Sequence, residues 1–314
     1  MGCPKLLLID LNAYQCYIIS MDINTQLAYA AGYIDGDGCF HIRKQQSKFV
    51  NHFIITSTNR NVLAWFKKTF GGTISSAKKN QPKKHKPLYQ FSIKKKIGIP
   101  FTESIIPYLI EKIEEAKVFI DFANSKSIDE RILLISKMNI LKNSTNLVSK
   151  NMKIEFESLR KTIDPSQEDF SYLAGFIDAE CCLGIQRYRS KNKPNFIYKI
   201  QLQCNNTKAP VFKWLLQRFG GQIHFIDRNT KDITQRNQLT WRLSSAALAN
   251  ILSEIYPFLK YKKPVCEELM KFYKTTLPNG GARHTDEFRG DYARAIEDRE
   301  NIVRKVHLLN LKGI

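Results

Sequence analysis

The feature that most constrains the fold is an internal duplication. Three blocks occur in the same order in both halves, and equivalent positions lie 143, 149 and 150 residues apart. A drift of only seven positions across the repeat indicates a duplicated domain with short loop insertions, so the chain should fold as two copies of one unit. The paired blocks are AYAAGYIDGDG (28–38) with SYLAGFIDAEC (171–181), WFKKTFGG (65–72) with WLLQRFGG (214–221), and PYL (107–109) with PFL (257–259).

Within each copy the hydrophobic pattern changes in the same order. Residues 26–37 and 169–180 are apolar and rich in small side chains, which predicts a buried helix. Alternation then predicts two strands, with Phe40 and Ile42 pointing inward and their polar neighbours outward. Residues 61–70 are amphipathic and stop at a Gly-Gly pair, a common helix end. A second hairpin and a third helix follow, so each copy is predicted to have the order αββαββα.

The repeats also set the predicted domain boundaries. The segment between the copies is mostly polar with short helical stretches, and the chain closes with an amphipathic helix. The predicted units are an N-terminal extension without assigned function (1–22), a first repeat (23–124), a linker (125–167), a second repeat (168–276) and a C-terminal extension with a helix (277–314).

The composition fits a folded chain with a polyanionic partner. The 314 residues carry a net charge of +20 and 43% of them are hydrophobic, so the charge sits on a chain that can build a core. Seven cysteines without a C-x-x-C pair match neither a disulfide framework nor a zinc site, which predicts a reducing, intracellular setting. No apolar run reaches the roughly 20 residues that span a bilayer, so no membrane partner is predicted.

The two apolar helices share a stripe of small residues spaced four apart. Such a stripe allows two helices to cross with their backbones close together, so we expect the copies to pair through these helices. Pairing would place the helix-terminal acids Asp37 and Glu180 side by side. The stripe consists of Ala28, Gly32 and Gly36 in the first copy and Ser171, Gly175 and Ala179 in the second.

Two carboxylates at helix C-termini are electrostatically unfavourable, because each helix end and each neighbouring acid opposes ionisation. A cation is therefore expected, and oxygen ligands with room for water and phosphate suit Mg²⁺ better than zinc. On a chain with a charge of +20 this pattern indicates phosphodiester hydrolysis. An EF-hand loop starting at Asp35 is disfavoured because its sixth position would be Phe40 instead of glycine.

The sequences AAGYIDGDG (30–38) and LAGFIDAEC (173–181) resemble the two signature motifs of a single-chain, two-repeat LAGLIDADG homing endonuclease, and the resemblance extends from about Gln26 to Thr275. It implies an α+β fold of two tandem αββαββα repeats, forming a pseudo-twofold monomer with two DNA-facing antiparallel sheets. It implies a site-specific endonuclease that cuts both strands of a long asymmetric site across the minor groove and leaves short 3′ overhangs.

The resemblance also assigns residues. Asp37 and Glu180 would bind the catalytic Mg²⁺, with the backbone carbonyls of Gly36 and Ala179 as further ligands. Mn²⁺ is expected to substitute, and Ca²⁺ to bind without supporting efficient cleavage. The second motif departs from the pattern, ending in Cys181 instead of glycine, and the two acids differ, so metal geometry and strand-cleavage rates need not be equal.

Basic and polar residues near the acids are implied as well. Lys112 and Lys262, each five positions after a proline, would stabilise phosphate charge or order water from the helix that follows the second hairpin. The alternative is a surface lysine on a helix. Asn59 and Lys208, six positions before the repeated tryptophans, would organise water.

The strands are long enough to follow DNA. About 10 residues at ~3.3 Å span roughly 10 base steps, so two sheets would cover about 20 base pairs. Arg and Gln favour guanine and adenine edges respectively. The residues predicted to contact bases are Arg43, Gln45, Thr56, Gln90, Lys94, Gln186, Tyr188, Gln203, Asn205, Arg228, Gln238 and Arg242. The predicted phosphate contacts are Lys83 and Lys84 with their lysine-rich loop, Lys94 to Lys96, and Arg187, Arg189, Lys191 and Lys193.

Two other functions stay open on the same scaffold, an intron-encoded RNA maturase and a DNA-binding regulator that has lost cleavage. Both acids are present, which favours the enzyme and leaves a dual role with host intron RNA open. The predicted partner is double-stranded DNA, bound by a monomer, with no small-molecule substrate. An organelle and a prokaryotic cytoplasm both agree with the composition.

Overall fold

The computed structural model describes residues 22–76, 87–144, 148, 150–189, 196–228, 236–275 and 286–312. The N-terminal extension up to residue 21 and the predicted phosphate contacts Lys83, Lys84, Lys191 and Lys193 lie outside the described residues.

Each half of the chain has the predicted order αββαββα. The first repeat consists of α1 (Ile23–Asp37), β1 (Gly38–Gln45), β2 (Lys48–Ser57), α2 (Arg60–Phe70), β3 (Thr73–Ser76), β4 (Tyr89–Lys94) and α3 (Lys95–Ile105). The second consists of α7 (Gln167–Glu180), β5 (Cys181–Arg189), β6 (Phe196–Asn206), α8 (Pro210–Phe219), β7 (Gln222–Ile226), β8 (Gln238–Leu243) and α9 (Ser245–Ile255).

The two sheets have the same topology. Their strand orders are β1-β2-β4-β3 and β5-β6-β8-β7, and every neighbouring pair is antiparallel. One face of each sheet is buried under helices through large side chains such as Phe53 and Trp241. The alternate residues of the same strands form the opposite face. We call this second face the open face, because most of its side chains are exposed or half-buried.

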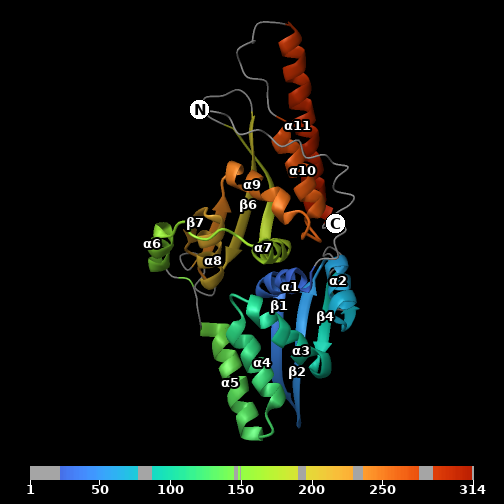
Figure 1. Cartoon of the computed structure of the whole chain (residues 1–314), viewed down its shortest axis with the longest axis vertical. Helices are drawn as coiled ribbons and strands as arrows, with labels where there is room; N and C mark the ends of the chain where they lie inside the picture. Colours follow the sequence, from blue (N-terminus) through green and yellow to red (C-terminus); the bar gives the residue numbers. More distant parts are fainter. Residues whose placement is uncertain are drawn as a thin grey trace.

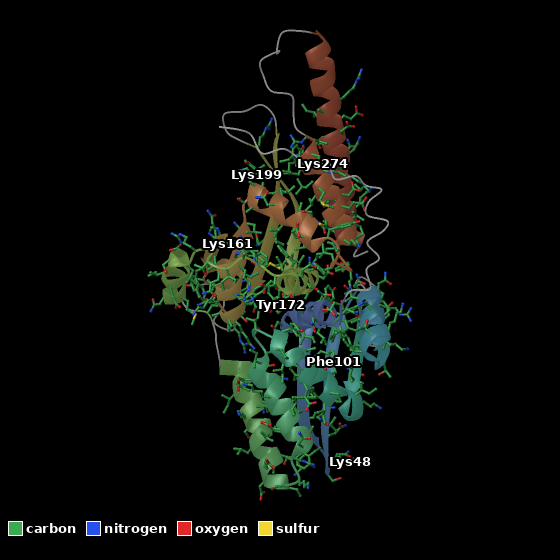
Figure 2. The ribbon with its side chains drawn as sticks, in the orientation of Figure 1. Lys48, Phe101, Lys161, Tyr172, Lys199 and Lys274 are labelled. Atoms are coloured by element: carbon green, nitrogen blue, oxygen red, sulfur yellow. A yellow bond between two sulfur atoms is a disulfide. The ribbon has the colours of Figure 1, made fainter. Side chains whose placement is uncertain are left out.

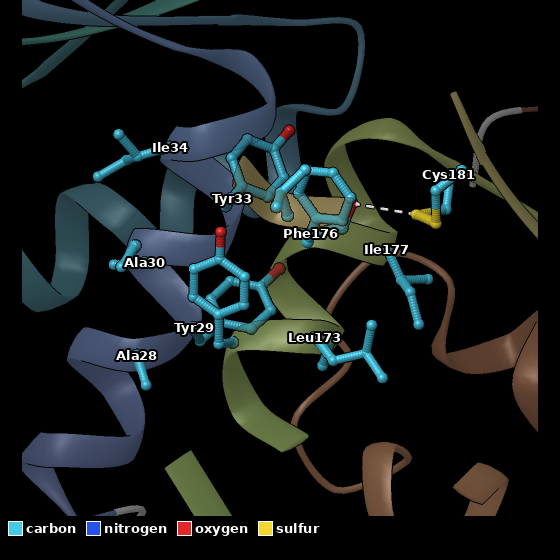
Figure 3. Close-up of a cluster of buried hydrophobic side chains, with 14 of the residues drawn as sticks. Ala28, Tyr29, Ala30, Tyr33, Ile34, Leu173, Phe176, Ile177 and Cys181 are labelled. Atoms are coloured by element: carbon cyan, nitrogen blue, oxygen red, sulfur yellow. Dashed lines mark hydrogen bonds between the residues drawn. A yellow bond between two sulfur atoms is a disulfide. The ribbon is translucent and has the colours of Figure 1, made fainter. Parts of the chain in front are cut away.

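The repeats join where α1 crosses α7. Figure 1 shows the two repeats placed end to end, with this helix pair between them. A Cβ atom added to Gly32 would lie 2.0 Å from the carbonyl oxygen of Tyr172, and one added to Gly175 would lie 2.0 Å from that of Tyr29. Backbone therefore packs on backbone, as the stripe of small residues predicts, and the buried rings of Tyr29, Tyr33 and Phe176 lie around the crossing (Figure 3).

Further helices extend the two repeats. The 3-10 turn η2 (Ile106–Tyr108) and α4 (Ile113–Asn124) follow α3, and α10 (Lys263–Lys274) follows α9. The pattern αββαββα did not include α4 and α10. In the predicted linker lie α5 (Ile128–Ser144) and α6 (Lys150–Ser158), and α11 (Asp286–Lys312) is the C-terminal helix. No helix in the described part of the chain is long and apolar enough to cross a membrane.

The cysteines behave differently from the prediction. Cys181 and Cys204 are cross-strand partners in β5 and β6, and they form a disulfide. The expectation that no disulfide forms was therefore wrong for this pair. Its partners are 23 residues apart and meet only through strand pairing, so neither the odd cysteine count nor the missing C-x-x-C pair reveals it.

Candidate active site

The helix crossing brings together the acids that end the two motif helices. Asp37 is the last residue of α1 and Glu180 the last of α7. A Cβ atom on Gly36 would lie 2.5 Å from the Cβ of Ala179 and 2.8 Å from the Cγ of Glu180, which shows how closely the two helix ends approach. Both acid side chains are exposed to solvent, so a substrate has access to them.

The two carboxylates oppose each other's ionisation. Desolvation by the surrounding protein, and to a smaller extent the negative charge of Glu180, raise the pKa of Asp37 to about 7. Desolvation likewise raises the pKa of Glu180. The charges of Lys112 and Lys262 act in the opposite direction on both acids. The site therefore has a negative centre that two ammonium groups only partly neutralise.

The two lysines cap the motif helices. The Nζ of Lys112 donates to the carbonyl oxygens of Ile34 at 2.7 Å and Gly38 at 2.9 Å, and it lies 3.2 Å from that of Gly36. Lys262 donates equivalently to the carbonyl oxygens of residues 177 and 178. These bonds place a positive charge at the negative end of each helix. The lysines are N-cap residues of α4 and α10, so the prediction that they lie within the helix after the second hairpin was wrong.

A second pair of acids, not singled out from the sequence, positions these lysines. The carboxylate of Asp35 accepts hydrogen bonds from the backbone N–H groups of residues 110–112, at 2.8, 3.1 and 2.9 Å. Asp178 accepts the equivalent bonds from residues 260–262, at 2.8, 3.0 and 2.7 Å. Each aspartate thereby fixes the turn that carries its lysine. Their position, two residues before the terminal acid in both motifs, was the signal that could have identified them.

Asn59 and Lys208 make other contacts. Asn59 is buried and caps α2, accepting hydrogen bonds from the backbone N–H groups of Asn61 and Val62. Lys208 joins the repeats, with its Nζ 2.9 Å from a carboxylate oxygen of Glu115. These contacts give both residues structural roles, and their water-organising role stays a prediction.

The donor set at the acid pair suits a hard cation. The predicted ligands are all oxygen atoms, from the carboxylates of Asp37 and Glu180 and the carbonyls of Gly36 and Ala179. The carbonyl of Gly36 already accepts from Lys112, which would have to share it. Among the described residues no group of three or more His, Cys, Asp and Glu side chains could hold a metal, so further ligands would come from water or substrate.

The open faces of the sheets carry most of the residues predicted to contact bases. Lys48, at the first hairpin turn, and Lys199, on β6, lie far from the helix pair in opposite directions (Figure 2), so the sheets extend away from the acids on both sides. Arg228 follows the end of β7. The residues on the open faces are Arg43, Gln45, Thr56, Gln90, Lys94, Gln186, Tyr188, Gln203, Asn205, Gln238 and Arg242.

Arg187 and Arg189 do not belong to this set. They alternate with Gln186 and Tyr188 and therefore point to the opposite face of β5. The guanidinium of Arg187 lies 5.9 Å from the ring centre of Tyr198, whose hydroxyl bonds to Glu300 on α11. Their role as phosphate contacts stays a prediction, and strand alternation places both side chains on the face of β5 opposite the residues predicted to contact bases.

Residues 30–128, which cover most of the first repeat, match the sequence profile of a family described as "LAGLIDADG endonuclease". The second repeat has the same fold and an equivalent motif helix. The first repeat is therefore similar to this endonuclease family, and the second repeat shares its fold. Each of the two motif helices supplies a glycine at the crossing, an aspartate that fixes a lysine turn, and a terminal acid.

Solved structures share the two-repeat LAGLIDADG fold. The meganuclease I-SmaMI bound to uncleaveable DNA is 18% identical with a TM-score of 0.62, and the match covers 90% of this chain and 99% of that one. The LAGLIDADG meganuclease I-AabMI bound to uncleaved DNA is 21% identical with a TM-score of 0.57, covering 85% and 98%. At these identities the likeness establishes the fold. No curated protein sequence matches the chain.

Proposed function

We propose that the chain is a site-specific endonuclease that hydrolyses both strands of a long asymmetric DNA site with Mg²⁺. One observation carries the proposal: two motif helices from different repeats bring Asp37 and Glu180 together between two open sheet faces that carry basic and amide side chains. The net charge of +20 favours a polyanionic substrate. The solved relatives with this fold are described as bound to DNA.

The chain's own residues would perform distinct tasks. Asp37 and Glu180, with the carbonyls of Gly36 and Ala179, would hold the metal. The open face of each sheet would bind in the DNA major groove on one side of the cleavage site. When bound, a divalent cation supplies a water of lowered pKa and neutralises charge at the scissile phosphate. The resemblance to LAGLIDADG homing endonucleases implies cleavage across the minor groove with short 3′ overhangs, and the position of the acids between the two sheets supports cleavage at the centre of the bound site. Mn²⁺ should substitute, and Ca²⁺ should support binding without efficient cleavage.

Lys112 and Lys262 are assigned a positioning role. Their ammonium groups are bonded to helix-end carbonyls, so their charge favours the ionised carboxylates without contact to the phosphate. Replacement of either lysine by methionine should therefore lower cleavage more than DNA binding.

The two remaining functions, an RNA maturase and a cleavage-inactive regulator, do not require the paired acids.

The test combines a randomised double-stranded DNA library with acid variants. We expect the protein in Mg²⁺ to cut discrete sequences and leave short 3′ overhangs. Asp37→Asn and Glu180→Gln should abolish cleavage and still bind the selected sequence in Ca²⁺. Sequence-specific binding without cleavage by the unaltered protein, in Mg²⁺ and in Mn²⁺, would exclude the nuclease and favour a regulator. Binding to folded RNA alone would favour the maturase.

A further inference from the structure

The open face of the second sheet carries a continuous chain of polar side chains across two strands. In the β6–β8 pairing, Asn205 lies opposite Thr240 and Gln203 opposite Arg242. The Thr240 hydroxyl donates to Oδ1 of Asn205 at 2.7 Å, and Nε2 of Gln203 donates to the same oxygen at 3.2 Å. Nε of Arg242 donates to Oε1 of Gln203 at 2.9 Å. We call these four residues the relay.

Only one assignment of donors and acceptors satisfies the relay. A guanidinium only donates, so Gln203 must turn its Oε1 toward Arg242. That orientation directs the Nε2 of Gln203, which also only donates, toward Asn205. The side-chain atom of Asn205 that accepts this hydrogen bond must therefore be Oδ1. Thr240, which is fully buried, then donates its hydroxyl proton to the same Oδ1. The arginine therefore fixes both amides, and the buried threonine anchors the far end.

The relay presents donors toward solvent. Between described residues, no hydrogen bond is made by the terminal nitrogens of Arg242 or by Nδ2 of Asn205. Arg242 is exposed, and Asn205 is half-buried. Gln203 and Arg242 also line a hollow of about 340 Å³ on this face, together with Gln186 and Gln201. The relay would therefore donate hydrogen bonds to the edge of a base that contacts it.

We infer that the relay reads an acceptor-rich base edge, with guanine opposite Arg242, and that Thr240 is a positioning residue for this specificity. Guanine presents N7 and O6 as two major-groove acceptors, whereas adenine needs a donor and an acceptor together from a glutamine. Because Arg242 already uses Oε1 of Gln203, the usual pairing of glutamine with adenine does not apply here. The inference rests on the proposed function, because the relay needs a bound DNA duplex to read.

The first repeat has no such relay. The strand registers match Ile54, Thr56, Gln90 and Ser92 with Gln203, Asn205, Thr240 and Arg242 respectively. An isoleucine and a serine thus replace the central glutamine and the arginine. The effect of the relay on base preference should therefore be confined to the half-site bound by the second repeat, and the other half-site provides an internal control.

The test measures base preference at every position, by sequencing DNA bound from a randomised library in Ca²⁺. We compare the full chain with Thr240→Val, which keeps the side-chain shape and removes the hydroxyl, and with Thr240→Ser, which keeps the hydroxyl. Gln203→Met removes the centre of the relay at a half-buried position, so it decides the question if Thr240→Val fails to fold. The melting temperature of each variant is recorded beside its preferences.

The unaltered chain should select guanine at the position that faces Arg242, in the half-site bound by the second repeat. Thr240→Val and Gln203→Met should lower that preference about two- to tenfold, the effect of losing one hydrogen bond, while the other half-site is unchanged. Thr240→Ser should retain it. Adenine at that position, or unchanged preferences in both Thr240→Val and Gln203→Met, would overturn the relay and leave the endonuclease intact. If the unaltered chain selects no sequence at all, the proposed function itself fails, and the relay with it.

Discussion

The hydroxyl of Tyr172, in the second repeat, donates a hydrogen bond at 2.7 Å to the buried carboxylate of Asp35, in the first. The equivalent bond runs the other way, from Tyr29 to Asp178 at 2.8 Å. Because each aspartate also holds the turn that carries a helix-capping lysine, the geometry of each half of the site depends on a side chain from the other repeat. Repeat association and site assembly are therefore the same event.

Removal of the Tyr172 hydroxyl should destabilise the chain. Tyr172→Phe leaves a buried carboxylate without one of its donors, and we expect the free energy of unfolding to fall by about 1.5–3 kcal/mol. Urea denaturation measures the loss, and Tyr29→Phe should behave alike. Tyr273→Phe, at a ring that is 48% exposed, is the matched control and should change little. Equal stability of Tyr172→Phe and the control would contradict the cross-repeat bond.

The helix crossing should not tolerate a methyl group. Gly32→Ala places a Cβ 2.0 Å from a carbonyl oxygen of α7, so the helices must separate, and we expect a loss of about 3 kcal/mol or more. Gly98→Ala is the control: its nearest neighbour would be 3.5 Å away, and alanine is favoured over glycine within the helix α3. Thermal unfolding of both variants measures the difference. A melting temperature of Gly32→Ala equal to that of the unaltered protein would contradict the prediction.

Substitution of an acid in the pair should raise the stability of the fold and abolish DNA cleavage. In the presence of EDTA, Asp37→Asn removes the repulsion between the two carboxylates, so the free energy of unfolding should rise. Both side chains are exposed, and solvent screening limits the gain to about 0.2–1 kcal/mol. Cleavage should be lost in the same variant. A variant that is both inactive and clearly less stable would show that Asp37 has a structural role instead.

Lys260 should make stability depend on pH. Its ammonium lies 4.4 Å from the ring centre of Trp65, and burial lowers its pKa to about 8. Because the unfolded state then binds more protons between pH 8 and about 10.5, stability from this residue should rise with pH across that window. Relative to the unaltered protein, Lys260→Met should shift the change in stability between the two pH values toward a smaller rise, whereas Lys274→Met, at an exposed position on α10, should leave it unchanged. Denaturation of the three proteins at pH 7.5 and pH 10 decides the matter, and identical pH profiles would refute the assignment.

Short-range pattern was sufficient for much of the fold. The strand alternation at Phe40 and Ile42 predicted which face of β1 is buried, and the Gly-Gly pair after Phe70 predicted the end of α2. The same reasoning failed where a residue's role depends on a distant partner. The disulfide partner of Cys181 is 23 residues away, on the neighbouring strand.

The sequence by itself determined the duplication, the order of the elements and the position of Asp37 and Glu180 at the ends of two equivalent helices, because repeats and periodicity are local properties of a chain. Only the tertiary structure decided that Asp35 and Asp178 position the lysines, that Lys208 joins the repeats through Glu115, and that Thr240 anchors a polar relay. Each of those roles is a directional contact between residues far apart in the chain. Such a contact is set by how helices cross and strands register, which no local pattern encodes.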